Sequence, residues 1–413
     1  MSAFDAGPAG VPSCGEERPA MRVLVTTWAW NSHYLPLVPT MWALRAAGHE
    51  VRVASQPRLA PVITESGGVA VPVGPDLDHD EVRARAMGDL SLRAVPAVPA
   101  AGESMTGWPA DHLARVARVF GVFTAYSEAM LADLLDYARW WRPDLVLYDP
   151  TTYAGPLVAA ALGVPAVRHT HGVDVTYQAR DVVTGLVAPL ADRIGVSDVD
   201  LVGALTVDPC PPSLQFDSPV RRATIRYLPY NGPAVLPAWL WGAAGERPRV
   251  CVTWGTSTSR LAGDMPVPLR ELIEWTHELG YEVIACVGAA DAATLGPLPD
   301  DVRIAESLPL HLVLPSCAAV VHQGGNGTML TAGYCGVPQL VLPQLPDQTF
   351  HAGQLAAANA GRVLVGGEVG PDAVHVELAK LVTGGESATA LRTEILAQPT
   401  PAAAIPQLVE LAG

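Results

Sequence analysis

The 413-residue sequence contains a single lysine, Lys380, and its other strong bases are all arginines. A P-loop needs a lysine beside the phosphates of its nucleotide, and pyridoxal phosphate needs one for its Schiff base. Lys380 lies near the C-terminal end in a polar segment with no glycine-rich loop before it. Both of these chemistries are therefore excluded.

Basic residues are outnumbered, 26 against 41 acidic ones, which gives a net charge of −15. A chain this acidic has no general electrostatic reason to bind nucleic acid or an anionic membrane surface. No uncharged apolar run reaches the roughly 18 residues of a membrane span. Residues 1–20 lack the apolar segment of a signal peptide, so we expect a disordered leader on a cytoplasmic protein.

Cysteine is also scarce. The six cysteines have no C-x-x-C spacing, and no cluster of cysteine and histidine indicates zinc. We expect them to be buried thiols in a reducing compartment. Two acidic triplets, Asp78-His79-Asp80 and Asp198-Val199-Asp200, lie in polar stretches, and we interpret them as solvated surface rather than as metal sites.

Hydrophobic residues, by contrast, make up 49% of the chain, which is enough for two large cores. A buried β-branched run at 22–27 is followed by an apolar helix from about Leu35 and a second strand at 51–54. The same β-α-β pattern returns with strands at 249–253 and 281–286. The sequence therefore predicts two domains of like design.

A second pair of matching segments supports this duplication. Asp149 ends a predicted strand fourteen residues before the Gly-Val-Pro that starts at Gly163, and His322 stands in the same relation to Gly336. Open α/β sheets bind ligands at the carboxyl ends of their strands. We expect Asp149 and His322 to lie on opposite sides of one cleft.

The predicted fold class is α/β, with two Rossmann-like doubly wound parallel-sheet domains facing a cleft. Residues 74–115 break the β-α rhythm and are interpreted as a mobile insertion of the first domain. The expected boundaries are a leader at 1–20, an N-terminal domain at 21–235, a linker at 236–246, a C-terminal domain at 247–395, and a segment at 396–413 that returns to the first domain.

The strongest chemical signal is the run His322-Gln323-Gly324-Gly325-Asn326-Gly327-Thr328 after a buried strand. Free N–H groups at a helix start, together with the helix dipole, favour a phosphate. The imidazole of His322 is expected to add a donor and Thr328 a hydroxyl. A glycine-rich turn that only packs is the alternative.

Further along, Asp347-Gln348 follows the segment Gly336–Pro343 by a few residues. A carboxylate and an amide together supply the acceptors and donors that sugar hydroxyls need. An ordinary helix cap formed by Asp347 is the alternative.

These three motifs, H-x-G-G-x-G-T, G-V-P-Q and D-Q, resemble those of the family 1 nucleotide-sugar glycosyltransferases of the GT-B fold. The resemblance runs from Met21 to about Val365. Within the family, Ser32-His33, the segment 208–215 and Tyr230-Asn231-Gly232 look like the actinobacterial enzymes that attach deoxysugars to polyketide antibiotics. The resemblance implies an inverting reaction without metal or cofactor, in which the nucleotide sugar is a co-substrate. It also implies the donor-binding residues, which are Thr256, Ser257, Leu308, His322, Gly324, Gly325, Asn326, Gly327, Thr328, Asp347 and Gln348.

The family's general base corresponds to His33, and its carboxylate partner to Asp149. A histidine near a helix N-terminus is discouraged from holding a proton, so it can accept one. A carboxylate at its side would orient the ring and stabilise the imidazolium as it forms. A structural histidine and a strand-end aspartate that caps a helix are the alternatives.

Aromatic residues gather around this loop and could stack on a flat apolar acceptor. We expect acceptor contacts from Trp28, Trp30, Tyr34, Tyr153 and His171. Core packing is the alternative for the aromatic residues, and hydrogen bonding within loops is the alternative for His171.

The expected function is transfer of a deoxysugar, linked to dTDP, to a hydroxyl of a lipophilic polyketide-type aglycone. UDP-glucose stays open as a donor. The rival functions are a GT-B epimerase that acts on a UDP-sugar and a non-catalytic activator of another transferase. The expected partners are the two small-molecule substrates, with a homodimer or an auxiliary activator protein as further candidates.

Overall fold

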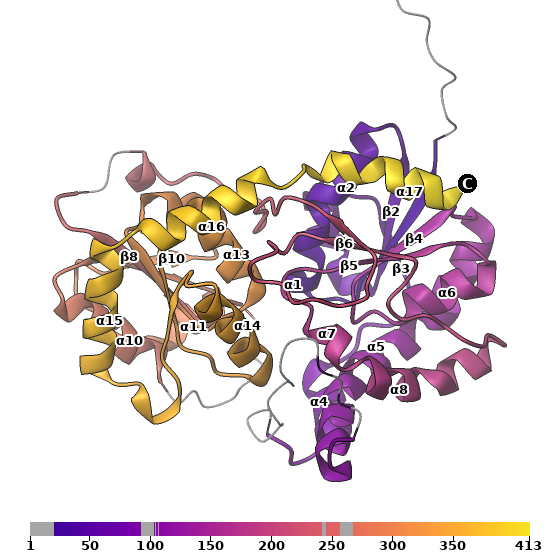
Figure 1. The fold of residues 1–413 in the computed structure, drawn as a ribbon, viewed down its shortest axis with the longest axis horizontal. Helices are drawn as coiled ribbons and strands as arrows, with labels where there is room; N and C mark the ends of the chain where they lie inside the picture. Colours follow the sequence, from indigo (N-terminus) through magenta and orange to yellow (C-terminus); the bar gives the residue numbers. More distant parts are fainter. Residues whose placement is uncertain (1–19, 92–102, 104, 106, 242–244, 257–266) are drawn as a thin grey trace, which may run out of the picture.

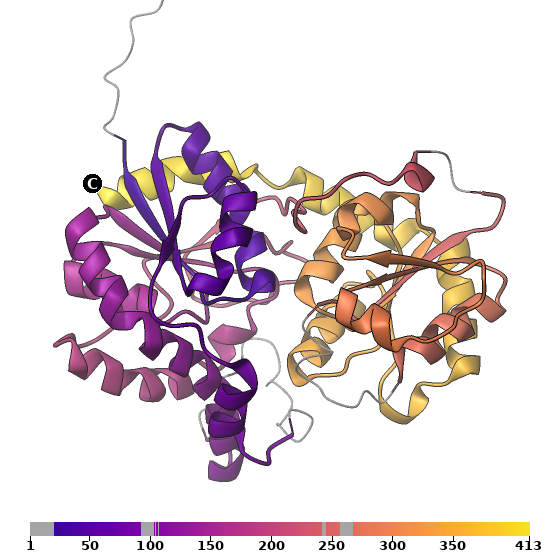
Figure 2. The same ribbon diagram turned by 180° about the vertical axis from the view of Figure 1, so that it is seen from behind.

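The computed structural model describes residues 20–91, 103, 105, 107–241, 245–256 and 267–413. Each domain is built on a parallel sheet with helices on both faces (Figures 1 and 2). The first sheet has the strand order β3-β2-β1-β4-β5-β6-β7 and the second β10-β9-β8-β11-β12-β13. The predicted pair of doubly wound α/β domains is therefore confirmed.

The strands of the first sheet are β1 (Arg22–Thr26), β2 (Glu50–Ser55), β3 (Ala70–Pro72), β4 (Leu145–Tyr148), β5 (Ala166–His169), β6 (Leu205–Asp208) and β7 (Arg222–Thr224). Those of the second are β8 (Arg249–Thr253), β9 (Glu282–Val287), β10 (Arg303–Glu306), β11 (Ala319–His322), β12 (Gln339–Val341) and β13 (Arg362–Val363).

The helices of the first domain are α1 (Asn31–Tyr34), α2 (Val38–Ala46), α3 (Ala60–Glu65), α4 (His79–Met87), α5 (Ala110–Trp141), α6 (Ala154–Leu162), α7 (Val175–Gln178) and α8 (Arg180–Arg193). Those that follow are α10 (Leu269–Glu278), α11 (Ala289–Thr294), α12 (Leu310–Val313), α13 (Asn326–Cys335), α14 (Pro346–Ala357), α15 (Pro371–Thr383), α16 (Glu386–Ala397) and α17 (Ile405–Ala412).

The central strands are buried on both faces, which explains their continuous apolar runs. In β1, Val23 and Val25 pack into one core with residues of α2, and Leu24 packs into the opposite core with residues of α5 and α6. All three side chains are completely buried. The sheet is thus fixed from both sides, and the loops at its carboxyl edge are held in place.

The two sheets share one topology. If strands are numbered from the start of each domain, both follow the order 3-2-1-4-5-6, whose direction of winding reverses between the first and fourth strands. Asp149 directly follows the fourth strand of its sheet, and His322 ends the fourth strand of the other. Gly163 and Gly336 end the next helices with nearly the same left-handed φ, 70° and 71°. The repeat in the sequence is therefore a repeat in space.

The chain crosses between the domains at its C-terminal end (Figures 1 and 2). Leu391 and Ile395 of α16 pack in a cluster with Met329 and Leu330 of α13. Beyond α16, Ile405 and Leu408 enter the core of the first domain beside α2. This crossing strap ties the two sheets together on the side away from the first domain's α4.

Residues 74–115, which are interpreted from the sequence as an insertion that breaks the β-α rhythm, contain a regular helix in their described part. Residues 79–87 form this helix, α4, because Asp78 caps the helix by accepting hydrogen bonds from the N–H groups of Asp80 and Glu81. Val82 and Met87 then pack against Val122 of α5.

In the part of the chain that the structure describes, no helix combines the length and apolar character needed to cross a membrane.

Candidate active site

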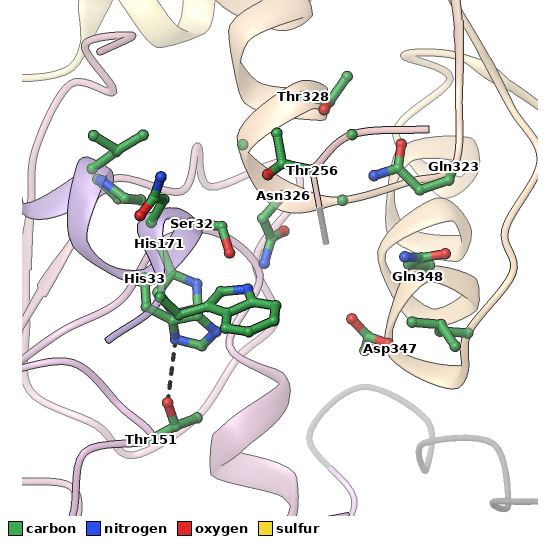
Figure 3. Close-up of a pocket in the computed structure, with 18 of the residues that line it drawn as sticks. Ser32, His33, Thr151, His171, Thr256, Gln323, Asn326, Thr328, Asp347 and Gln348 are labelled. Carbon is green, nitrogen blue, oxygen red and sulfur yellow. Dashed lines mark hydrogen bonds between the residues drawn. The ribbon is translucent and has the colours of Figure 1, made fainter. Parts of the chain in front are cut away.

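The carboxyl edges of the two sheets enclose a cavity of about 590 Å³. Its lining includes His33 from the first domain, and Asn326 and Asp347 from the second (Figure 3). In each sheet the direction of winding reverses between the first and fourth strands, and both of these places open into the same cavity.

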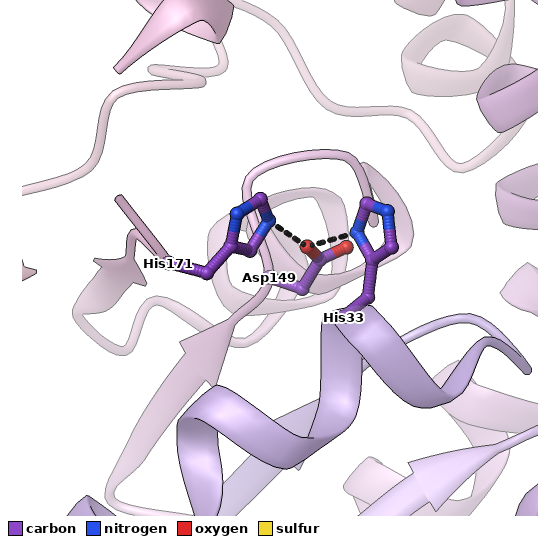
Figure 4. A group of neighbouring side chains, drawn as sticks. All are labelled: His33, Asp149 and His171. Carbon is purple, nitrogen blue, oxygen red and sulfur yellow. Dashed lines mark hydrogen bonds and ion pairs between the residues drawn. The ribbon is translucent and has the colours of Figure 1, made fainter. Parts of the chain in front are cut away.

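His33 and His171 converge on one carboxylate (Figure 4). The Nδ1–H group of His33 donates to Oδ1 of Asp149 at 2.9 Å, and the Nε2–H group of His171 donates to the same oxygen at 3.3 Å. In the neutral tautomer that this contact favours, Nδ1 of His33 carries the ring proton and its Nε2 atom can act as an acceptor.

The second oxygen of Asp149 is held by hydroxyl groups. Thr151 and Thr152 each donate to Oδ2 at 2.7 Å. Burial of Asp149 by itself raises its pKa, but the charges and hydrogen bonds of His33 and His171 outweigh that effect, and the net pKa is lowered well below the usual range. The carboxylate therefore stays ionised and oriented.

The loop that carries His33 is braced from the same side. The indole Nε1–H group of Trp28 donates to the Thr151 hydroxyl at 3.0 Å, and the main-chain N–H of Trp28 donates to the Thr152 hydroxyl at 3.0 Å. The helix expected from about Leu35 begins earlier, at Asn31, so His33 lies within the first helical turn. The threonines were missed because nothing local in the sequence distinguishes them from ordinary turn residues.

The second domain contributes a helix N-terminus. Gly325 precedes α13 as its N-cap residue, and Gly325, Asn326, Gly327 and Thr328 all line the cavity. Gly324 has φ +92°, a conformation that favours glycine, and an added Cβ would lie 3.0 Å from Cγ1 of Val341. The backbone thus needs glycine here to turn sharply out of β11.

His322 does not reach the cavity, which corrects its expected role as a phosphate donor. Its side chain is completely buried. The N–H of Gly324 donates to its Nδ1 atom at 3.0 Å, and its Nε2–H donates to Oε1 of Gln339 at 2.9 Å. Burial lowers the pKa of His322 to about 4, so the ring is neutral and serves to hold the Gly324 turn.

Asn326 joins the two domains. Its Oδ1 atom accepts a hydrogen bond from the N–H of Val173 at 3.2 Å, and its Nδ2–H group donates to Nε2 of His351 at 3.3 Å. Nδ1 of His351 lies 3.2 Å from the carbonyl oxygen of Gly324. This contact places the loop that carries His171 directly against the start of α13.

The remaining donor-side predictions have mixed outcomes. Thr256, Leu308, Asp347 and Gln348 line the cavity, whereas Ser257 lies outside the described residues. Asp347 occupies the first turn of α14, but the N-cap residue of that helix is Leu345 and no side chain caps it. The alternative of Asp347 as a helix cap is therefore excluded, and its side chain faces the cavity (Figure 3).

On the acceptor side, Trp28, Trp30 and His171 line the cavity, but Tyr34 and Tyr153 do not. Tyr34 follows His33 by one helical position, about 100° around the axis, and points into the core. There its hydroxyl hydrogen-bonds with that of Ser66 at 2.6 Å, and burial raises its pKa to about 12. Tyr153 is also buried, at the start of α6. The acceptor contacts expected from these two tyrosines are therefore wrong.

The acceptor half has apolar walls that were not predicted. They come from α4, α5 and Met105, and the lining residues are Met87, Met105, Val116, Val119, Phe120, Val122 and Phe123. The rings of Trp28 and Trp30 stack with their centroids 5.0 Å apart, and Phe123 meets Trp28 edge-on at 5.6 Å. This half of the cavity is suited to a flat, lipophilic molecule.

The duplicated fold and this two-sided cavity define the GT-B class of nucleotide-sugar glycosyltransferases. Models of the family described as erythromycin biosynthesis protein CIII-like match residues 42–255 with the N-terminal domain and residues 270–411 with the C-terminal domain. The chain is 38% identical over 418 residues to the 10-deoxymethynolide desosaminyltransferase of Streptomyces venezuelae, with 95% of this chain and 97% of the relative covered.

Solved structures agree. The glycosyltransferase VinC in complex with dTDP superposes with a TM-score of 0.80 at 34% identity, over 95% of this chain and 99% of VinC. The spinosyn rhamnosyltransferase SpnG, complexed with spinosyn aglycone, gives a TM-score of 0.78 at 32% identity, over 94% of this chain and all of SpnG. The chain belongs to the erythromycin biosynthesis protein CIII-like family, and it is a glycosyltransferase of the antibiotic deoxysugar-transferase type.

Proposed function

We propose that this enzyme moves a deoxysugar from a dTDP-sugar to a hydroxyl of a lipophilic polyketide-type aglycone, with inversion at the anomeric carbon and without a metal ion. One observation carries the proposal. An imidazole held by the buried carboxylate of Asp149 lies across a single cavity from the N-terminus of α13. The dTDP bound to VinC and the aglycone bound to SpnG support the two classes of substrate.

The donor half accounts for the leaving group. The N–H groups of residues 325–328 and the dipole of α13 favour the charge that builds on the diphosphate as the C1–O bond breaks. The described residues that line the cavity include one arginine, Arg83 on α4, and no lysine. In this proposal, neutral donors rather than cationic side chains therefore hold the diphosphate.

The acceptor half accounts for the nucleophile. Nε2 of His33 removes the proton of the acceptor hydroxyl while its oxygen forms the new bond to C1 from the face opposite the diphosphate. Asp149 stabilises the imidazolium that results, and the nucleoside diphosphate leaves with the bonding electrons. General-base assistance of this kind contributes roughly 10²–10⁴-fold to the rate.

The sugar is proposed to be a 6-deoxyhexose that retains hydroxyl groups, because Asp347 and Gln348 both line the donor half. His351 contributes differently, since its two ring nitrogens are engaged with Asn326 and the Gly324 carbonyl. We assign it to support of the phosphate loop rather than to the sugar.

The proposal that no metal ion is needed must account for the cluster of His33, Asp149 and His171, because side chains of these types can bind a metal. Their potential ligand atoms lie within 4.8 Å of one another. Both imidazoles already hydrogen-bond to the same carboxylate oxygen. We therefore assign the cluster to proton transfer. Turnover should be unchanged after exhaustive treatment with EDTA, and loss of activity that added Mg²⁺ or Zn²⁺ restores would contradict this assignment.

The central test is His33→Ala. We expect the variant to lose roughly 10²–10⁴-fold in turnover and to bind dTDP as the wild type does, because His33 lies on the acceptor side. Products are measured by mass spectrometry with a panel of aglycones and with dTDP- and UDP-sugars. Retention of more than about a tenth of wild-type turnover would count against His33 as the base.

The same assay separates the two rival functions. An epimerase would convert a UDP-sugar without any acceptor, so incubation with donor alone would yield the epimer. A non-catalytic activator would consume no donor under any condition. The apolar walls of α4 and α5 favour transfer to an aglycone, because an epimerase needs no such chamber.

A further inference from the structure

Arg83 stands apart from the other residues of the acceptor half. It is the one arginine or lysine among the described residues that line the cavity. On the first-domain side, the described lining residues include no aspartate or glutamate; the one carboxylate of the lining is Asp347, across the cavity on α14. A positive charge therefore faces a chamber whose wall on α5 is apolar.

Within the described residues, Arg83 makes no hydrogen bond or ion pair. Its Nε–H group is covered by protein and has no acceptor. The neighbouring acidic residues of α4 do not compensate it, because Asp80 and Glu81 are exposed and Asp78 is engaged in capping the helix. A half-buried guanidinium without a partner is costly, so the side chain that lines the cavity is poised for an anion.

The position of Arg83 separates it from the reacting groups. The ring centroids of His33 and Trp28 are 4.9 Å apart, and the ring of His79 lies 4.7 Å from that of Trp30 at the start of α4. Arg83 is four residues further along this helix, about 6 Å beyond His79. A series of ring contacts therefore runs from the proposed base through the stacked pair of Trp28 and Trp30 to His79, on the helix that carries Arg83.

We propose that Arg83 determines acceptor specificity by pairing with a carboxylate at the end of the aglycone remote from the hydroxyl that is glycosylated. The planar guanidinium fork matches the two oxygens of a carboxylate, and the stacked pair of Trp28 and Trp30 holds flat rings. The net charge of −15 repels an anionic acceptor in general, so a local cation in the chamber favours the binding of such a substrate. This inference rests on the proposed transfer to a lipophilic aglycone.

The test compares a dihydroxyanthraquinone carboxylic acid with its methyl ester. For the wild type we expect a higher kcat/KM with the acid. Arg83→Met keeps the length of the side chain and removes the charge. It should lower kcat/KM for the acid by about 10- to 100-fold, mainly through KM, with little change for the ester. Arg83→Lys should recover part of the loss, because it restores charge but not the fork.

The matched control is Arg85→Met, on the exposed face of the same helix. It should leave both acceptors unaffected. The proposal is overturned if Arg83→Met reduces acid and ester equally, if it leaves their ratio unchanged, or if it weakens binding of dTDP. The last result would assign Arg83 to the diphosphate instead.

Binding measured without turnover keeps this test independent of the transfer reaction. Quenching of tryptophan fluorescence on titration with the acid and the ester reports occupancy of the chamber beside Trp28 and Trp30. If no sugar is transferred to any acceptor, the proposed function fails. The assignment of Arg83 still stands or falls on whether its replacement abolishes the preference for the acid in binding.

Discussion

The two domains place different chemistry at the same point of the same topology. Asp149 and His322 both close the fourth strand of a sheet ordered 3-2-1-4-5-6, and both are completely buried. Asp149 is ionised and accepts hydrogen bonds from two imidazoles that line the cavity, those of His33 and His171. His322 is neutral, and its partners are Gln339 and the N–H of Gly324.

The difference shows how one fold supports two tasks. In the proposed reaction the first domain moves a proton, so its strand-end residue carries charge and the partners of that residue line the cavity. In the same proposal the second domain holds a charged leaving group, so its strand-end residue shapes the turn that leads to the N–H groups at the start of α13. Burial decides both outcomes, because only a partner within hydrogen-bond distance keeps a buried group charged.

The largest expected effect comes from Asp149→Asn. The amide keeps the size of the side chain but neither fixes the tautomer of His33 nor stabilises its charged form. We expect turnover to fall roughly 10³–10⁴-fold, with binding of dTDP unchanged. His322→Asn, at the equivalent position, should keep turnover within about 10-fold. If steady-state assays showed equal losses of turnover for the two variants, the proposed difference between the roles of Asp149 and His322 would be contradicted.

Next in size is Gly172→Ala, which tests the contact between the two sites. Gly172 has φ +153°, and an added Cβ would lie 2.2 Å from Cγ of Asn326. The clash would force the His171 loop away from α13 and misalign the two substrates. We expect kcat/KM to fall about 10- to 100-fold.

The control for that variant is Gly185→Ala in α8, where an added Cβ meets nothing within 4 Å. It should leave kinetics unchanged and stabilise the fold by up to about 1 kcal/mol. If Gly172→Ala were as active as this control, the contact through Asn326 would have no part in aligning the domains.

The smallest expected effect is the pH dependence of folding stability that His322 causes. Its pKa is lowered by burial to about 4, below the unfolded value of 6.5. The unfolded chain therefore takes up the proton first. The contribution of His322 to the free energy of unfolding is fully present above about pH 6.5 and declines as the pH falls toward 4. Between about pH 7.5 and pH 5, this one group should cost about 2 kcal/mol.

Urea denaturation of the wild type and His322→Asn at both pH values measures this cost. His169, whose pKa burial lowers to about 4, contributes a similar acid sensitivity to both proteins. The variant should therefore lose about 2 kcal/mol less than the wild type on acidification. Identical losses would mean that His322 takes up its proton in the folded state.

The sequence was sufficient to predict the duplication, since Asp149, His322 and their downstream glycines recur at one spacing. It also predicted that His33 and residues 325–328 meet at one cavity, because parallel strands end at a common edge. These features depend on local pattern and topology alone.

What the sequence could not predict depends on orientation. Tyr34 is buried because α1 begins at Asn31. Successive side chains of a helix point about 100° apart around its axis, so His33 and Tyr34 face different sides. His171 reaches Asp149 from the loop that follows the neighbouring strand β5, and Arg83 reaches the cavity from a helix that composition alone did not predict. Such contacts are set by packing between elements rather than by spacing along the chain.

The most direct measurement is a crystal structure of the enzyme with dTDP and an aglycone bound together. The account predicts the diphosphate on the N–H groups of residues 325–328 and the acceptor hydroxyl about 3 Å from Nε2 of His33. A diphosphate bound elsewhere, or a His33 ring turned away from the acceptor, would contradict it.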